Sequence, residues 1–238
     1  AIVGMAGAPT PAADERPIIA ASMFGNTTPC VDRARAALEA AGFEVQVFHA
    51  TGTGGATMET LIDDGFVRGV LDLTTTEWAD ELAGGTLSAG PTRLEAAARA
   101  GVPQVLAPGC LDMVNFGPRT SVPARYDGRQ FYEWNPTVTL MRTTVAENAE
   151  LGAIIARKLN AAQGPLAVFI PRGGVSAIDV QGQVFHDAAA DMALISALRA
   201  HLSPGIEVHT LDLDINNPAF ADAMAERFDE LYQEWLRQ

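Results

Sequence analysis

Short, continuously apolar runs alternate with longer amphipathic stretches along most of the chain. The apolar runs have the length of strands and cover residues 17–23, 43–50, 69–74, 102–108, 166–170 and 206–213. Stretches with helical spacing of apolar residues follow at 28–41, 58–64, 77–83, 92–100, 146–162, 187–202 and 218–236. Because strands that are apolar throughout are typical of parallel sheets covered on both faces, we predict a doubly wound, Rossmann-like α/β fold of about six, mostly parallel strands.

Two segments depart from this rhythm. Residues 1–16 contain Pro9, Pro11 and Gly7, so we expect a linker or the remnant of a preceding subdomain, with residues 17–238 forming one α/β domain. Residues 109–145 show no clear period, and a stretch of this length without regular elements is usually functional.

Charge and composition exclude several classes of function. The 238 residues carry 16 Lys and Arg against 29 Asp and Glu, a net charge of −13, which argues against binding to nucleic acid or to an anionic membrane surface. The one lysine, Lys158, lies in a helical pattern, which argues against a Walker A or Schiff-base lysine. No apolar run reaches the roughly 20 residues of a membrane span, no signal peptide is recognisable, and two cysteines are too few for a disulfide scaffold. We therefore expect a cytoplasmic protein.

The loops that follow the six predicted strands are the candidates for ligand binding, because open α/β sheets bind ligands at the carboxyl ends of their strands. Gly, Thr and Asn dominate these loops and offer amides and hydroxyls to an oxyanion such as phosphate or carboxylate. The candidate ligand-binding residues are Gly25, Asn26, Thr27, Thr51, Gly52, Thr53, Gly54, Gly55, Thr57, Thr75, Thr76, Arg172, Gly173, Gly174 and Ser176.

The Gly-rich segment Thr51–Thr57 gives the sharpest signal, since a Gly-rich turn before a helix directs amides and the helix dipole at an anion. It resembles a dinucleotide fingerprint, except that Thr57 occupies the position of the third glycine. The alternative is a tight connection that only requires small residues. Arg172 similarly fits either a bidentate contact to an anion or an ordinary surface position.

Candidates for acid–base chemistry are His49, Glu77 and Asp112, which lie at or just after predicted strand ends. Each also fits a structural role, and Thr74–Glu77 fits a capped helix start. The four histidines form no recognisable metal motif, so no metal site is predicted. Cys110 is interpreted as a buried apolar cysteine, because no Cys–His pairing is apparent.

The irregular segment has a charge of its own. Residues 113–145 contain four arginines and two acidic residues, which gives a net charge of 4 − 2 = +2. Aromatic residues are frequent in the same segment. This composition is typical of interfaces and also suits a lid over an anionic ligand. We expect a homo-oligomer, with the lid as the alternative.

Four motifs carry a resemblance to a known family. They are Met23–Cys30 (MFGNTTPC), Phe48–Gly55 (FHATGTGG), Leu71–Glu77 (LDLTTTE) and Leu111–Gly117 (LDMVNFG). In this order they resemble the second, C-terminal subdomain of the UPF0261 family, the Tm-1-like ATP-binding domain proteins, over about residues 16–230. The residues Asn135–Thr137 and Gly174–Asp179 add to the resemblance.

The resemblance implies ATP or a similar nucleotide as ligand, with or without Mg²⁺, and the N-terminal subdomain of such proteins as a partner. It implies no established reaction. Two alternatives stay open: an enzyme acting on a small carboxylated or phosphorylated metabolite, and an interaction or oligomerisation module.

Overall fold

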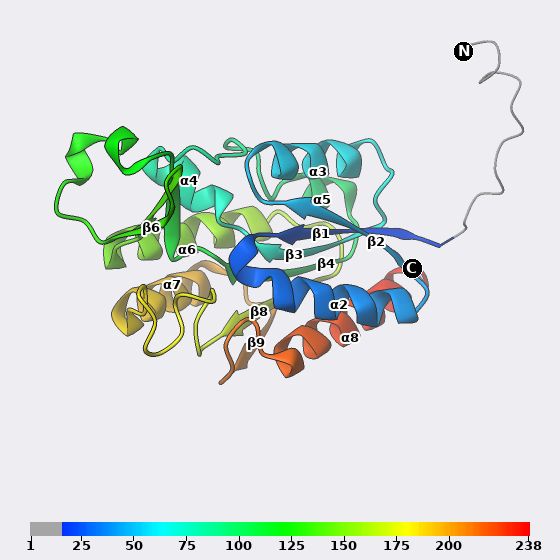
Figure 1. The fold of residues 1–238 in the computed structure, drawn as a ribbon. Coiled ribbons are helices and arrows are strands. Elements are labelled where there is room, and N and C mark those ends of the chain that lie inside the picture. Colours follow the sequence, from blue (N-terminus) through cyan, green and yellow to red (C-terminus); the bar gives the residue numbers. More distant parts are fainter. Residues whose placement is uncertain (1–15) are drawn as a thin grey trace, which may run out of the picture.

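The apolar runs form a six-stranded parallel sheet in the computed structural model, which describes residues 16–238 (Figure 1). The segment 1–15, and with it most of the expected linker, lies outside the described residues. The strands run in the order β2-β1-β3-β4-β8-β9. Their bounds are β1 (Ile18–Met23), β2 (Glu44–His49), β3 (Gly69–Thr74), β4 (Gln104–Gly109), β8 (Leu166–Pro171) and β9 (Glu207–Leu211). The predicted doubly wound α/β fold is confirmed.

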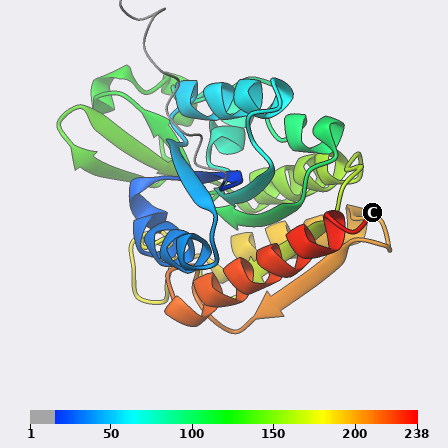
Figure 2. The same ribbon diagram turned by 90° about the vertical axis from the view of Figure 1, so that its right-hand side faces the viewer.

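Helices cover both faces of this sheet, as Figures 1 and 2 show. One face carries α2 (Thr28–Ala40) and α8 (Pro218–Trp235), whose apolar residues share one core with the sheet. The opposite face carries α3 (Thr53–Asp63), α4 (Glu77–Ala83), α5 (Ala96–Ala100), α6 (Val145–Leu159) and α7 (Ala188–His201). The strands alternate between these layers: Leu71 packs toward α2 and α8, and the adjacent Val70 packs toward α3 and α5. Strands buried on both faces explain the continuous apolar runs in the sequence.

The strand order creates one point at which neighbouring loops leave the sheet toward opposite faces. The loop after β1 leads to α2 on one face, whereas the loop after β3 leads to α4 on the other. Such a topological switch point between β1 and β3 is where flavodoxin-like sheets bind their ligands. The 3₁₀ turn η1 (Gly25–Thr27) lies directly at this point.

The segment 109–145, which has no clear period in the sequence, forms a second sheet. Its strands β5 (Met113–Phe116), β7 (Val138–Arg142) and β6 (Phe131–Asn135) are antiparallel and run in the order β5-β7-β6. The short 3₁₀ turns η2 (Arg119–Ser121) and η3 (Ala124–Tyr126) connect β5 to β6. The segment projects to one side of the main sheet (Figure 1). Its pattern is hidden because polar residues such as Asn115 and Thr139 are buried, whereas most of β6 is exposed.

Two predicted helix boundaries are wrong. Helix α3 begins at Thr53 and not at Met58, so most of the Gly-rich segment is its first turn. The helix predicted over 92–100 is confined to α5, because Leu94 has a positive φ of 73° and turns the preceding residues out of helical conformation. No helix in the described part of the chain combines the length and the hydrophobicity needed to cross a membrane.

Candidate functional site

The loops after β1, β3, β4 and β8 meet at the switch point and are hydrogen-bonded to one another. The carbonyl oxygen of Asn26 accepts from the amide of Ala177 at 3.1 Å, which joins the loops after β1 and β8. The hydroxyls of Thr27 and Thr74 lie 2.7 Å apart and join the loops after β1 and β3. The hydroxyl of Thr76 reaches the segment after β4 by donating to a backbone carbonyl at 3.4 Å. The structure thus brings together the predicted residues Asn26, Thr27, Thr75, Thr76 and Ser176.

A carboxylate and a hydroxyl form the polar centre of this region. Ser176 donates its hydroxyl to Oδ2 of Asp112 at 2.8 Å, and both residues are fully buried. Burial raises the pKa of Asp112 to about 6, although Arg142 and the Ser176 hydroxyl lower it. Oδ1 of Asp112 and Oγ1 of Thr75 are buried without a hydrogen-bond partner among residues 16–238. Buried polar atoms of this kind are rare and require an explanation.

The Gly-rich segment directs its amides at an anion that belongs to the chain itself. The amides of Gly52 and Gly55 donate to Oε1 of Glu77 at 2.8 and 3.1 Å. The carboxylate thus occupies the place that the helix N-terminus offers to an anion. A ligand phosphate could use these two amides only by displacing Glu77. Among the other candidates, the Thr57 hydroxyl bonds the carbonyl of Thr53 within the helix.

A fully buried arginine holds Glu77 in this position. Nε of Arg93 donates to Oε2 of Glu77 at 2.7 Å, and its terminal nitrogens grip both oxygens of Asp72 at 2.5 and 2.7 Å. Glu59 lies 3.2 Å from the same guanidinium and also accepts the first amides of the α5 turn. Burial nevertheless outweighs Arg93 and raises the pKa of Glu77.

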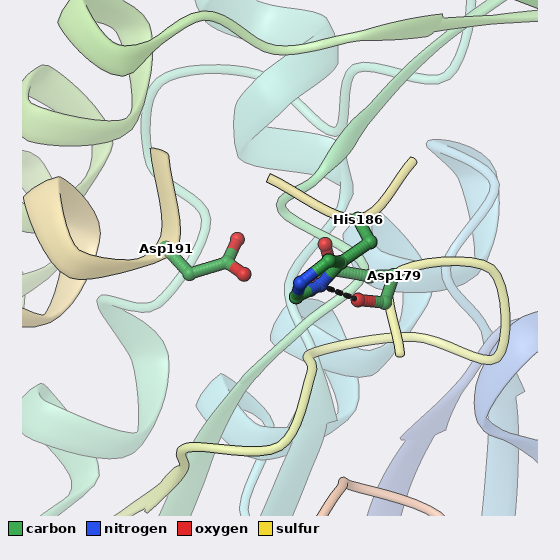
Figure 3. Close-up of side chains that lie close together, drawn as sticks. All are labelled: Asp179, His186 and Asp191. Atoms are coloured by element: carbon green, nitrogen blue, oxygen red, sulfur yellow. Dashed lines mark hydrogen bonds between the residues drawn. The ribbon is translucent and has the colours of Figure 1, made fainter. Parts of the chain in front are cut away.

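A second buried arginine gathers a carboxylate cluster at the ends of β7 and β8. The same terminal nitrogen of Arg142 donates to Asp179 at 3.0 Å and to Asp191 at 2.7 Å. His186 lies beside them, and its Nδ1 donates to the backbone carbonyl of Asp179 at 3.0 Å (Figure 3). Burial and the neighbouring carboxylate of Asp112 raise the pKa of Asp179 to about 9.

Several candidate residues lie away from this centre. Arg172 is exposed and pairs with the exposed Asp212 at 2.9 Å. Its neighbour Gly173 is exposed and bonded to the segment after β9. Gly174 has a φ of 129° and packs against residues 179–180, so it is needed for the turn. His49 is exposed at the end of β2, and Gly25 is exposed with open space around its Cα.

Cys110 is fully buried, as predicted from the lack of an apparent Cys–His pairing. Its φ of 59° places it in the left-handed region, which non-glycine residues seldom occupy. Burial and the nearby carboxylates of Asp112 and Asp179 raise the pKa of its thiol well above the usual value. The residue is thus held as a thiol in a strained turn after β4.

The positive charge predicted for the irregular segment reaches its surface only in part, at the exposed Arg125 and at the half-buried Arg119, which lies over the ring of Phe131. Arg142 is buried between carboxylates, and Arg129 pairs with Glu147 at 2.6 Å. Strand β6 exposes Glu133 and Asn135 together with Tyr132 and Trp134, whose rings are in edge-to-face contact. The expected roles of this segment as an interface or a lid stay predictions.

Sequence reasoning named Glu77 and Asp112 but missed both buried arginines and the other carboxylates that surround them. Arg93 follows the Gly-rich loop by about forty residues and Arg142 lies in the segment without a period, so nothing local marks either as buried. The one available signal is the acidic residue inside the apolar run of β3, Asp72, since a buried carboxylate requires a cation or a proton.

The chain is similar in sequence to members of a known protein family. Residues 16–232 match the model described as "Uncharacterised protein family (UPF0261) C-terminal domain". A UPF0261 protein of Clostridium tetani is 51% identical over 95% of this chain and 57% of its own length, and one of Mesorhizobium japonicum is 48% identical over 96% and 58%. The ToMV resistance protein Tm-1(GCR237) of Solanum lycopersicum is 44% identical over 90% of this chain and 28% of its own length.

The esterase domain of a Rhodothermus marinus protein has a related fold, with a TM-score of 0.50 and 13% sequence identity over 96% of this chain and 90% of that one. The chain spans little more than half the length of the bacterial relatives. The family model covers nearly all described residues, and these relatives share about half of their aligned residues with the chain. The chain therefore belongs to the UPF0261 family and corresponds to its C-terminal domain.

Proposed function

We propose that this domain binds a phosphate-bearing small molecule, an ATP-like nucleotide first of all, where the loops after β1, β3, β4 and β8 meet. The observation that carries the proposal is the pair of partnerless buried atoms, Thr75 Oγ1 and Asp112 Oδ1, on the loops after neighbouring strands. A bound ligand would supply the hydrogen bonds that both atoms lack. The position beside the switch point agrees with the general location of ligands in such sheets.

The charge of the region bears on the form of the ligand. Asp112 and Glu77 are both buried there, and Arg93 and Arg142 are committed to carboxylates of the chain. A bare phosphate would therefore meet negative charge that no free lysine offsets. A divalent cation bound with the nucleotide would reduce this repulsion, which favours Mg²⁺–ATP over free ATP.

Two matched threonine variants test the proposal. Thr75→Val removes the partnerless hydroxyl at the switch point, and Thr139→Val removes an equally buried, partnerless hydroxyl from β7. Because neither hydroxyl has a partner among the described residues, each variant should fold. Each should be as stable as the wild type or more stable by about 1 kcal/mol. Calorimetry with ATP and Mg²⁺ should detect binding to the wild type and to Thr139→Val. Thr75→Val should bind at least about tenfold more weakly, which corresponds to one lost hydrogen bond.

The proposal fails if the wild type shows neither heat nor a thermal shift with ATP, ADP or inorganic phosphate. It also fails if the two variants bind equally well. Repeating the titration with a full-length UPF0261 relative distinguishes a site that requires the rest of such a protein from the absence of a site.

Asp112 supports a second candidate, an enzyme that acts on a small carboxylated or phosphorylated metabolite. Its pKa of about 6 and its free Oδ1 suit a group that accepts a proton near neutral pH. Asp112→Asn preserves an acceptor for the Ser176 hydroxyl but cannot take up the proton. Turnover of a metabolite by the wild type and its loss in Asp112→Asn, with binding retained, would establish the enzyme. Binding without turnover across a panel of such metabolites would contradict it.

A further inference from the structure

Three potential metal ligands converge beside the buried Arg142. Asp179 lies in the loop after β8, His186 precedes α7, and Asp191 lies in the first turn of α7 (Figure 3). One donor atom from each residue lies within 4.8 Å of the donor atoms of the other two. Ligand atoms around one metal ion at bond lengths of about 2.0–2.2 Å are about 3–3.5 Å apart in adjacent positions, so these donor atoms need to approach one another by at most about 1–2 Å to close the site.

The hydrogen bond of His186 prepares its ring for a metal. A backbone carbonyl can only accept, so the contact between Nδ1 and the carbonyl of Asp179 places the ring proton on Nδ1. In the neutral ring, Nε2 then carries the free lone pair. Histidines that bind metals almost always donate their other ring N–H to a carbonyl or carboxylate, which fixes tautomer and orientation in this manner.

The carboxylates of Asp179 and Asp191 lie side by side, and their oxygen atoms can accept further contacts. A single nitrogen of Arg142 bridges their Oδ1 atoms, and the amide of Val175 donates to Oδ2 of Asp179. Within the described part of the chain, no hydrogen bond reaches Oδ2 of Asp191. The side chain of Asp191 is 16% exposed and His186 is exposed, so an ion could enter from solvent.

When its carboxylates are ionised, the cluster has more negative charge than its own cation balances. Asp112, Asp179 and Asp191 interact electrostatically with one guanidinium, which leaves two carboxylate charges in excess when all are ionised. Asp112 is fully buried, and no described residue forms a hydrogen bond with its Oδ1. Buried charges of this kind are normally paired or bind a metal.

We propose that Asp179, His186 and Asp191 bind a divalent transition-metal ion, with Arg142 orienting the carboxylates from behind. One imidazole and two carboxylates suit Mn²⁺, Fe²⁺, Co²⁺ or Zn²⁺, whereas Mg²⁺ and Ca²⁺ prefer oxygen ligands alone. Three protein ligands leave coordination positions open for water or for a ligand oxygen. The site requires no nucleotide, so its existence does not depend on the proposed function.

The test uses the chelator-treated chain, titrated with Co²⁺ and followed by visible absorption, and with Zn²⁺ followed by calorimetry. The wild type should bind one ion with a coordination spectrum. His186→Ala and the isosteric Asp191→Asn should each weaken binding at least about tenfold. His201→Ala is the matched control, because His201 is exposed at the end of α7 and its Nδ1 also contacts a backbone carbonyl, at 2.8 Å. This control should bind Co²⁺ like the wild type.

Three results would overturn the proposal. The first is a wild type that binds neither Co²⁺, Mn²⁺ nor Zn²⁺ at a single site. The second is an affinity that His186→Ala leaves unchanged or that His201→Ala lowers equally, which would indicate ordinary surface histidine binding. The third is displacement of Co²⁺ by a modest excess of Mg²⁺, which would exclude an imidazole ligand. His186 is exposed, so its variant remains informative even if Asp191→Asn fails to fold.

Discussion

Replacing Arg93 by methionine tests whether one buried guanidinium holds together the centre of the sheet. Arg93 is 1% exposed and donates four hydrogen bonds: two to Asp72 and one each to Glu77 and Glu59. Methionine fills a similar volume without the charge. The variant therefore leaves Asp72 and Glu77 buried without a cation, while the amides of Gly52 and Gly55 keep their acceptor.

Removal of one partner from a buried ion pair costs about 3–5 kcal/mol, because the other charge stays buried and uncompensated. A domain of this kind has a total stability of about 5–15 kcal/mol, so Arg93→Met should lose about a fifth or more of it. The loss should shrink at lower pH. Burial already raises the pKa of Glu77 against the influence of Arg93, and removal of Arg93 raises it further. The folded variant then binds protons more readily than the unfolded chain, so its stability increases as the pH falls.

Urea unfolding followed by tryptophan fluorescence, at about pH 7 and about pH 5, measures both effects. Arg93→Lys serves as the second variant, since it retains the cation but not the bidentate geometry. We expect it to lose about 1–3 kcal/mol with little change in pH dependence. The reasoning is refuted if Arg93→Met loses less than about 1 kcal/mol, or if its deficit is the same at both pH values. Should Arg93→Met not fold, a lysine variant as stable as the wild type would refute it equally.

Two further predictions concern the start of α3 and the start of α6. A Cβ on Gly54 would lie 1.8 Å from the carbonyl oxygen of His49, so Gly54→Ala should lower the free energy of unfolding by about 1–3 kcal/mol or more. Gly25 has open space where a Cβ would lie, so Gly25→Ala should change the free energy of unfolding by less than about 0.5 kcal/mol in the same urea assay. Glu147 bonds Arg129 and the amide of Thr144, and these contacts lower its pKa. Glu147→Gln should therefore lower the free energy of unfolding by about 1 kcal/mol at neutral pH. This difference in stability from the wild type should vanish as the pH falls through the pKa of Glu147 in the folded protein. A difference that stays the same in acid would contradict an origin in the charge of Glu147.

The main sheet can be predicted from the sequence because strands that are buried on both faces are continuous runs of apolar residues. The run at 69–74 is recognisable as β3 although it contains Asp72, since its other residues pack into two apolar layers. The second sheet shows no such pattern. Strand β5 has four buried residues, one of them Asn115, and β6 is mostly exposed, so neither shows the alternation on which strand prediction depends. The buried ion pairs are equally invisible, because Arg93 and Glu77 become neighbours only when α3, α4 and the turn before α5 have packed together.

The Gly-rich segment shows why the same motif supports two interpretations. Small residues before a helix indicate that amides and a helix dipole converge on an anion, and the structure contains an anion at this point, the carboxylate of Glu77. The spacing of the glycines predicts that a hydrogen-bond acceptor lies against these amides. It does not indicate whether that acceptor is a ligand or another part of the chain. A side chain 22 residues away satisfies the amides, and Arg93 then balances the charge, as a lysine commonly does beside a bound phosphate. Two of the buried atoms that no residue of the described chain satisfies, Thr75 Oγ1 and Asp112 Oδ1, lie on the loops after β3 and β4 and are consequently a more specific indication of a ligand than the glycines.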